Sequence, residues 1–239
     1  MPEPGCRVGI ARYGLQMTTG SWQREADRLA QAAVAAGDAT GWFEQLWSKG
    51  RAGEIPVPWD TGQAHPLLAE WIGAREAAGP AQRAVVVGCG LGADAELVAT
   101  RGFDTVAFDV SPSAIELARE RHPDSPVKYE QADLFELDEQ WHQAFGLVVD
   151  VYTVQALPVS LRHQATAAVA DLAAPSGTLL LLMSAQDDDT DSQGPPWPLS
   201  RRDIDAFGSQ GLTPVKVERL PFRTMTSSHW RAEFTRILR

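Results

Sequence analysis

The sequence predicts an α/β protein in which helices cover both faces of a mostly parallel, doubly wound sheet. Short apolar or β-branched runs recur through the chain after residue 80, as expected of strands that are buried on both faces. The segments between these runs carry apolar residues three or four positions apart, which is the period of a helix packed on one side. Near the C-terminus the apolar residues instead alternate with polar ones, the pattern of antiparallel strands.

The part of the chain before the first strand is predicted to be helical. A capped helix is expected over residues 21–36, and a second short helix should hold the aromatic residues at 42–47 and end before Gly50. A third helix should run from about residue 63 to residue 78. We expect residues 21–79 to form a helical lid over a ligand; the alternative is that they only pack against the flank of the sheet.

Residues 80–239 are predicted to form a Rossmann-like core with a seven-stranded sheet. The five parallel strands are placed at 84–87, 105–108, 127–130, 145–152 and 178–183, and an antiparallel hairpin at 215–218 and 230–235 closes the sheet. Helices are expected around 114–121, 161–172 and 200–208. No repeat or linker divides residues 21–239, which should be a single domain, while residues 1–20 should be a flexible arm.

Composition and charge narrow the possible functions. The 239 residues are 44% hydrophobic and 22% charged, ordinary values for a folded domain. The net charge of −10 disfavours nucleic acid and anionic membrane surfaces as partners. No apolar run approaches the roughly 18 residues of a membrane helix, and no secretory signal is seen, so we expect a cytoplasmic protein. Cys6 and Cys89 lie far apart without histidine-rich neighbours, so no metal site is expected. Either a monomer or a homodimer is compatible with the sequence.

A glycine loop follows the first predicted strand and opens a helix. Gly88, Gly90 and Gly92 permit a tight turn in which backbone N–H groups face a ligand at a helix N-terminus. This spacing suits a nucleoside cofactor. With Ala93 it also satisfies the dinucleotide fingerprint, and a strand-to-helix turn without any ligand is a further interpretation.

Two carboxylates follow the next two strands. Asp109 ends the second predicted strand, where it could accept hydrogen bonds from ribose hydroxyls or could instead cap the following helix. Asp133, with Leu134 beside it, follows the third strand and could accept from an adenine amino group, or it could be an ordinary loop residue. Because the carboxyl ends of parallel strands share one edge of the sheet, the spacing favours an adenosyl cofactor.

Further residues extend this pattern along the chain. They are Trp47, then Pro58-Trp59-Asp60-x-Gly62, then Gly88-Cys89-Gly90-x-Gly92-x-Asp94, then Ala156-Leu157 with Arg162, and finally Gly194-Pro195-Pro196. In this order they resemble the class I S-adenosylmethionine-dependent methyltransferases, and within them the thiopurine, thiol and halide methyltransferase group. The resemblance covers about residues 41–239.

The resemblance implies an enzyme that uses S-adenosyl-L-methionine as its cofactor. By similarity, Trp47 and Trp59 would lie near the methionine end and the glycine loop would hold the carboxypropyl part. Asp109 would bind the ribose, and Asp133 with Leu134 the adenine. Asp150, at the end of the fourth strand, is also expected at the cofactor.

The sequence departs from the family pattern at two positions. Val86 stands where class I methyltransferases often have an acidic residue in the first strand, and this removes the usual contact to the methionine amino group. Val151 follows Asp150 where many thiopurine-type members carry arginine. We therefore do not expect thiopurines as the substrate.

The expected reaction is S-methylation of a small thiol. A thiol is partly ionised at neutral pH and needs little help to attack, and the sequence shows no obvious histidine–carboxylate dyad. Tyr152 and Arg162 are the candidate catalytic residues, with Gln155 and Trp197 nearby. The alternatives are that Tyr152 packs in the core and that Arg162 pairs with a surface carboxylate.

Two histidines remain without an expected catalytic role, and three other functions remain as alternatives. His163 and His229 have no recognisable partner in the sequence and are expected to be structural or solvated. The rival functions are O- or N-methylation of a small aromatic molecule, a nicotinamide-dependent oxidoreductase and a non-catalytic cofactor-binding protein.

Overall fold

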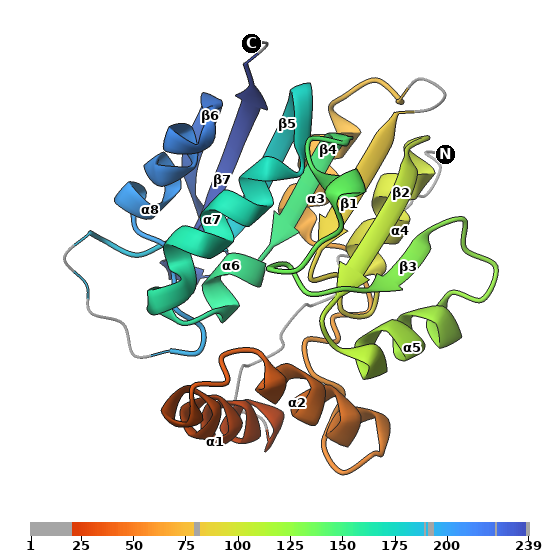
Figure 1. The fold of residues 1–239 in the computed structure, drawn as a ribbon, viewed down its shortest axis with the longest axis vertical. Coiled ribbons are helices and arrows are strands. Elements are labelled where there is room, and N and C mark those ends of the chain that lie inside the picture. The colour runs from red at the N-terminus through yellow and green to blue at the C-terminus, as the bar shows by residue number, and fades with distance from the viewer. Residues whose placement is uncertain (1–20, 79–81, 189, 191–193, 223, 238–239) are drawn as a thin grey trace, which may run out of the picture.

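A computed structural model describes residues 21–78, 82–188, 190, 194–222 and 224–237, so the predicted arm at 1–20 lies outside the described residues. One seven-stranded sheet with the order β3-β2-β1-β4-β5-β7-β6 forms the centre of the molecule (Figure 1). The strands are β1 Arg83–Val87, β2 Asp104–Asp109, β3 Lys128–Gln131, β4 Phe145–Val151, β5 Ala173–Ser184, β6 Leu212–Phe222 and β7 Thr224–Arg236. The first five are parallel and β7 runs antiparallel to both β5 and β6, which confirms the predicted fold class.

The predicted helices are all present and in the predicted order, but some differ at their ends, and the short helix at residues 153–156 was not predicted. The α-helices are α1 Ser21–Ala36, α2 Gly41–Arg51, α3 Pro66–Gly73, α4 Ala93–Thr100, α5 Pro112–Arg121, α6 Thr153–Ala156, α7 Arg162–Asp171 and α8 Arg201–Asp205. Three short 3-10 helices are η1 Glu139–Trp141, η2 Val159–Leu161 and η3 Ala206–Gln210. The second predicted helix continues through Gly50. The third begins later than predicted because His65 caps it and Pro66 occupies its first turn, and it ends earlier, at Gly73.

Two apolar layers hold the helices to the sheet. On one face, Val85, Val148 and Leu181 pack against α7, α8 and η3. On the other face, Val86 and Val149 pack against α3, α4 and α5. Because neighbouring strand residues point to opposite faces, the near-continuous apolar strands of the sequence serve both layers.

Helices α1 and α2 lie together across the carboxyl edge of the parallel strands (Figure 1). They enclose a small apolar core of their own, formed by Ala26, Leu29, Ala30, Ala33, Trp42 and Leu46. The aromatic end of α2 is thereby brought toward the loops that leave the sheet.

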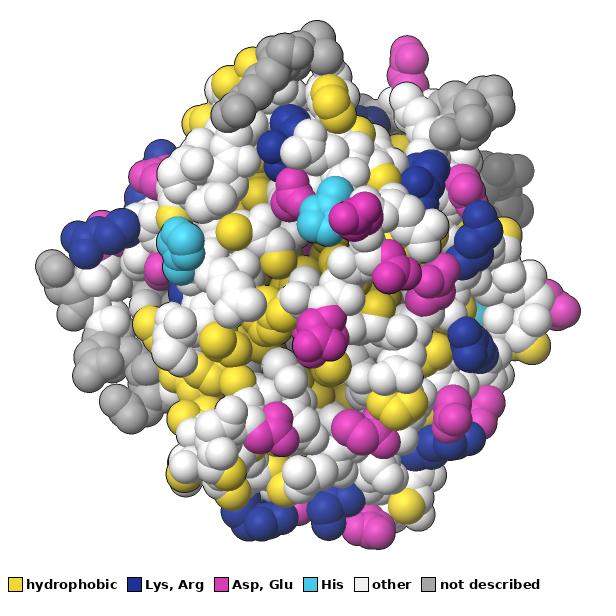
Figure 2. Space-filling model, viewed as in Figure 1, with side chains coloured by type: hydrophobic (Ala, Val, Ile, Leu, Met, Phe, Trp, Pro, Cys, Tyr) yellow, Lys and Arg dark blue, Asp and Glu magenta, His cyan; other side chains and the backbone are white. Residues whose placement is uncertain are grey.

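On the face drawn in Figure 2, lysine and arginine side chains are interspersed with acidic ones and lie mostly toward the rim. Apolar side chains show between them near the centre of that face. Among the helices of the described part of the chain, none is long and apolar enough to cross a bilayer.

Candidate functional site

The glycine loop lies between β1 and α4, and its three glycines have φ angles of +59°, +50° and +86°. A Cβ atom on Gly88 would lie 2.8 Å from Cγ2 of Thr153, and one on Gly92 would lie 2.8 Å from the ring of Tyr129. A Cβ atom on Gly90 would lie 3.3 Å from the indole of Trp47. The loop therefore excludes side chains both sterically and by its backbone conformation.

Asp109 lies beside this loop at the end of β2. Its Oδ2 accepts a hydrogen bond from the Gly90 amide and its Oδ1 one from the Ser111 amide, both at 3.0 Å. Burial raises the pKa of Asp109 to about 6. Each carboxylate oxygen has a second lone pair for a ligand hydroxyl. The cap of α5 is Ser111, whose Oγ accepts from the Ala114 amide, so the helix does not need Asp109 as its cap.

Glu44 of α2 was not singled out in the sequence, yet its carboxylate lies at the start of α5. It accepts hydrogen bonds from Oγ of Ser111 at 2.5 Å, from Oγ of Ser113 at 2.7 Å and from the Ser113 amide at 3.1 Å. A carboxylate is favoured at a helix N-terminus, where amide protons are unpaired. These contacts hold α2, and with it Trp47, over the glycine loop.

Trp47 and Trp59 belong to one aromatic cluster. Their ring centroids are 5.5 Å apart, and Trp22, Trp42 and Phe43 complete the cluster. Trp47 is buried, whereas Trp59 is 41% exposed and has a positive φ of 51°, unusual for a bulky residue. Its loop is fixed by Asp60, which accepts from both Nη atoms of Arg121 at 2.7 and 2.8 Å.

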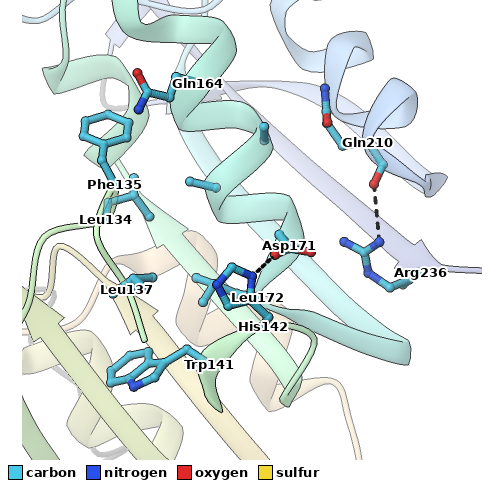
Figure 3. A pocket seen from close by; sticks show the side chains of 12 residues that line it. Leu134, Phe135, Leu137, Trp141, His142, Gln164, Asp171, Leu172, Gln210 and Arg236 are labelled. Atoms are coloured by element: carbon cyan, nitrogen blue, oxygen red, sulfur yellow. Dashed lines mark hydrogen bonds and ion pairs between the residues drawn. The ribbon is translucent and has the colours of Figure 1, made fainter. Parts of the chain in front are cut away.

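Asp133 and Leu134 lie in the loop after β3. Oδ1 of Asp133 accepts from the Phe135 amide at 2.9 Å, which makes a local turn. Leu134 is buried and lines a groove of about 420 Å³ between this loop and α7 (Figure 3). At the other end of this groove His142 contacts Asp171. Of the residues expected at the cofactor, Leu134 alone lines this groove; the glycine loop and Asp109 do not.

Asp150 is fully buried at the end of β4. Its Oδ1 accepts from the Thr153 amide at 2.9 Å and so caps α6, while its Oδ2 has no hydrogen-bond partner among the described residues. Burial raises the pKa of Asp150 to about 7. The structure thus gives Asp150 a capping role next to the predicted cofactor edge.

Arg162 is buried and its guanidinium is engaged. Nη2 donates to the carbonyl oxygen of Trp197 at 2.9 Å, and Nη1 lies 3.2 Å from Oδ2 of Asp203. The carboxylate pairing considered as an alternative for Arg162 is therefore present, although at a buried position. Gln155 reaches the same segment, because its main-chain carbonyl oxygen accepts from the Trp197 amide at 2.7 Å. Both residues fix the segment before α8.

Tyr152 directly follows β4 and lies beside two histidines, His65 before α3 and His229 on β7. Nε2 of His65 is 2.7 Å from Oη of Tyr152, and the ring centroids of Tyr152 and His229 are 5.5 Å apart. His65 and His229 are themselves 6.1 Å apart between ring centroids, and Nε2 of His229 lies 3.4 Å from Oγ of Ser184. Tyr152 has a φ of +67°, in the left-handed region. His229 is thus part of a buried cluster whose members the sequence did not indicate.

Comparisons with known proteins show the family to which the chain belongs. A family model described as Thiopurine S-methyltransferase matches residues 38–232. The chain is 30% identical over 193 residues to Thiocyanate methyltransferase 1 of Brassica oleracea, covering 78% of this chain and 80% of that protein. The chain belongs to the thiopurine S-methyltransferase family.

Two further likenesses extend the comparison. A 2-heptyl-1-hydroxyquinolin-4(1H)-one methyltransferase of Mycobacteroides abscessus is 28% identical over 150 residues, 59% of this chain and 64% of that protein. The N-methyltransferase NodS from Bradyrhizobium japonicum, solved with S-adenosyl-L-homocysteine, superposes with a TM-score of 0.64 at 20% identity. The superposition covers 81% of this chain and 97% of the NodS chain, and it shows a likeness of fold.

As a member of the thiopurine S-methyltransferase family, this protein is a methyltransferase that uses S-adenosylmethionine. The structure fits this cofactor. The glycines leave the backbone of the loop without side chains of its own, and Asp109 lies beside it with lone pairs for a ligand hydroxyl. Val86, which stands where class I methyltransferases often have an acidic residue, is buried in the apolar layer with α3 and α4.

Three features of the site were not predicted from the sequence. His65, Glu44 and the partners of His229 all depend on contacts between residues far apart in the chain. The one local signal for His65 is its place directly before Pro66, at the start of a helix.

Proposed function

We propose that this enzyme methylates the sulfur of a small thiol. The observation that carries the proposal is the closeness of Tyr152 to the glycine loop. The next residue, Thr153, donates from Oγ1 to the Val87 carbonyl at 2.8 Å and would be met by a Cβ on Gly88. An acceptor beside Tyr152 would therefore lie next to the cofactor loop.

The residues proposed to hold the cofactor are those that surround this loop. Gly88, Gly90 and Gly92 would present their backbone to the carboxypropyl part, and Asp109 would accept from the ribose hydroxyls. Trp47 and Trp59 would cover the methionine end. Asp133, Leu134 and Asp150 are proposed at the adenine side and the end of β4, with Asp150 acting through the backbone that it caps.

When bound, S-adenosylmethionine would supply a methyl group for in-line transfer to the acceptor thiolate, and the electron pair of the broken carbon–sulfur bond would stay on the cofactor sulfur. The protein's part is to place the acceptor sulfur and to exclude water, since positioning accounts for much of the rate of such a displacement. Tyr152 is proposed to contact the acceptor. We propose Arg162 as a positioning residue, because it holds the Trp197 segment rather than facing an open site.

The choice of sulfur rests on the relatives and on the side chains present. The family model is that of an S-methyltransferase, and one relative is named for thiocyanate, a sulfur nucleophile. Thiopurines are not proposed, because Val151 stands after Asp150. Helices α1 and α2 are proposed as the cover of a single domain, fixed by Glu44.

An oxygen acceptor is the second candidate. It is favoured by the relative named for a hydroxyquinolinone and by the buried histidines near Tyr152, since an oxygen acceptor commonly requires a base.

The test is a methyl-transfer assay with a matched panel of acceptors. Purified protein and labelled S-adenosylmethionine would be offered aliphatic thiols, thiophenol, thiocyanate, a hydroxyquinolinone, phenols and amines, with products identified by mass spectrometry. We expect thioether products. Methylated oxygen or nitrogen without any thioether would contradict the proposal.

A further inference from the structure

The ring of His65 has a defined tautomer. Its Nδ1 accepts a hydrogen bond from the Leu67 amide at 3.2 Å, because His65 is the N-cap of α3. A nitrogen that accepts from an N–H group carries no proton, so in the neutral ring the proton is on Nε2. That nitrogen lies 2.7 Å from Oη of Tyr152. His65 therefore donates and Tyr152 accepts.

The same histidine is anchored to the cofactor loop. Its backbone N–H donates to Oδ1 of Asp94 at 2.7 Å, in the first turn of the helix that follows Gly92. The backbone of Tyr152 lies in the left-handed region at φ +67°. Residues other than glycine rarely adopt this conformation, and those that do are often found at functional sites. The His65–Tyr152 contact thus joins the loop to the acceptor side.

We propose that His65 is a positioning residue that makes Tyr152 a hydrogen-bond donor to the acceptor sulfur. This inference rests on the proposed thiol methylation. Because His65 donates to Oη, the phenol proton can point toward the acceptor, and donation to the phenol oxygen strengthens the phenol as a donor. A hydrogen bond to the charged form of a group favours that form, so the bound thiol ionises at lower pH. The released proton goes to the solvent before the thiolate attacks.

Several titratable groups face this contact. In the described residues they are His65 itself before α3, His229 on β7 and Asp94 of α4, which reaches the pair through the His65 backbone. The Ser184 side chain beside His229 is neutral. The test must therefore separate His65 from His229.

Two substitutions separate the two functions of the His65 ring. In His65→Asn the side-chain oxygen can still cap α3, but it is too short to reach Tyr152. In His65→Gln the amide nitrogen can take the place of Nε2. Tyr152→Phe removes the donor, His229→Gln tests the neighbouring ring, and His163→Asn on the exposed face of α7 is the matched control.

The first readout does not depend on turnover. Nitrogen-15 NMR of the histidine rings should show one ring fixed with its proton on Nε2, and this signal should vanish in His65→Asn. Its persistence in His65→Asn, or a proton on Nδ1 of His65, would overturn the proposal.

The second readout is the pH profile of kcat/KM with two thiols. For an aliphatic thiol, largely protonated at neutral pH, we expect His65→Asn to lower kcat/KM about tenfold at pH 7 and to move the profile up by roughly one pH unit. For thiophenol, largely ionised there, the change should be under about twofold. Tyr152→Phe should act like His65→Asn, while His65→Gln, His229→Gln and His163→Asn should keep most of the wild-type profile.

Different results would refute the role of His65 and the proposed thiol methylation. Equal losses with both thiols at every pH in His65→Asn would show a structural role only. A wild-type enzyme that binds S-adenosylhomocysteine but methylates no thiol would refute the thiol activity and this role with it.

Discussion

Oε1 of Glu44 in α2 accepts a hydrogen bond from Oγ of Ser113, at 2.7 Å, in the first turn of α5. The same carboxylate binds Ser111, two residues after Asp109. A single side chain thus connects the N-terminal helices to the strand end that carries the proposed ribose ligand.

Replacing Glu44 by alanine should loosen this connection. Three hydrogen bonds to a charged group are lost, so we expect about 1–3 kcal/mol less stability by urea unfolding and weaker S-adenosylhomocysteine binding. Glu116→Ala is the matched control, because Glu116 contacts Arg51 on an exposed helix surface, where an ion pair contributes at most about 1 kcal/mol. Equal effects of the two substitutions would contradict a special role for Glu44.

Trp59→Ala should weaken cofactor binding without unfolding the domain. The ring is 41% exposed, so its removal leaves no closed cavity. By contrast, Trp42 is buried in the core between α1 and α2, and Trp42→Ala should cost about 3–5 kcal/mol. Calorimetric titration with S-adenosylhomocysteine and thermal unfolding would be compared for both variants. Unchanged affinity in Trp59→Ala would remove this residue from the site.

Asp150→Asn should stabilise the protein at alkaline pH. The carboxyl pKa rises from 3.8 to about 7 on folding, so between these values the folded state keeps a proton that the unfolded state has lost. The free energy of unfolding is therefore highest with respect to this group below pH 4. It falls by up to roughly 4 kcal/mol as the pH rises to 7.

Asparagine at position 150 can still cap α6 but does not ionise. Denaturant unfolding at pH 5 and at pH 8 should show wild type losing more stability than Asp150→Asn. At pH 8 the variant should be the more stable protein by about 1–3 kcal/mol. The opposite order at pH 8 would show that the buried charge is compensated.

Local sequence was enough to predict the strands and to bring the glycine loop and Asp109 to one edge of the sheet. The glycine loop and Asp109 each adjoin a strand whose apolar run is visible in the sequence, and parallel strands bring their carboxyl ends together. The same reasoning located the C-terminal hairpin, because the alternation of β7 is a property of neighbouring residues.

Contacts between distant residues could not be predicted in this way. Glu44 is separated from Ser111 by 67 positions and His65 from Tyr152 by 87, and neither pair has a sequence pattern that joins its members. Histidine is also an uncommon N-cap, so the start of α3 was placed too early. For Arg162 the sequence indicated a charged partner but not that the pair would be buried.

The edge formed by the glycine loop and Asp109 is proposed to bind the adenosyl cofactor. Calorimetric titration of the wild type and Asp109→Ala with S-adenosylhomocysteine and with NADH tests this proposal. Asp104→Ala, at the exposed start of the same strand, is the control. We predict micromolar S-adenosylhomocysteine binding, no NADH binding and at least about a 30-fold loss in Asp109→Ala, since two hydrogen bonds to a charge are removed. Binding of NADH in place of S-adenosylhomocysteine, or equal affinity in wild type and Asp109→Ala, would contradict it.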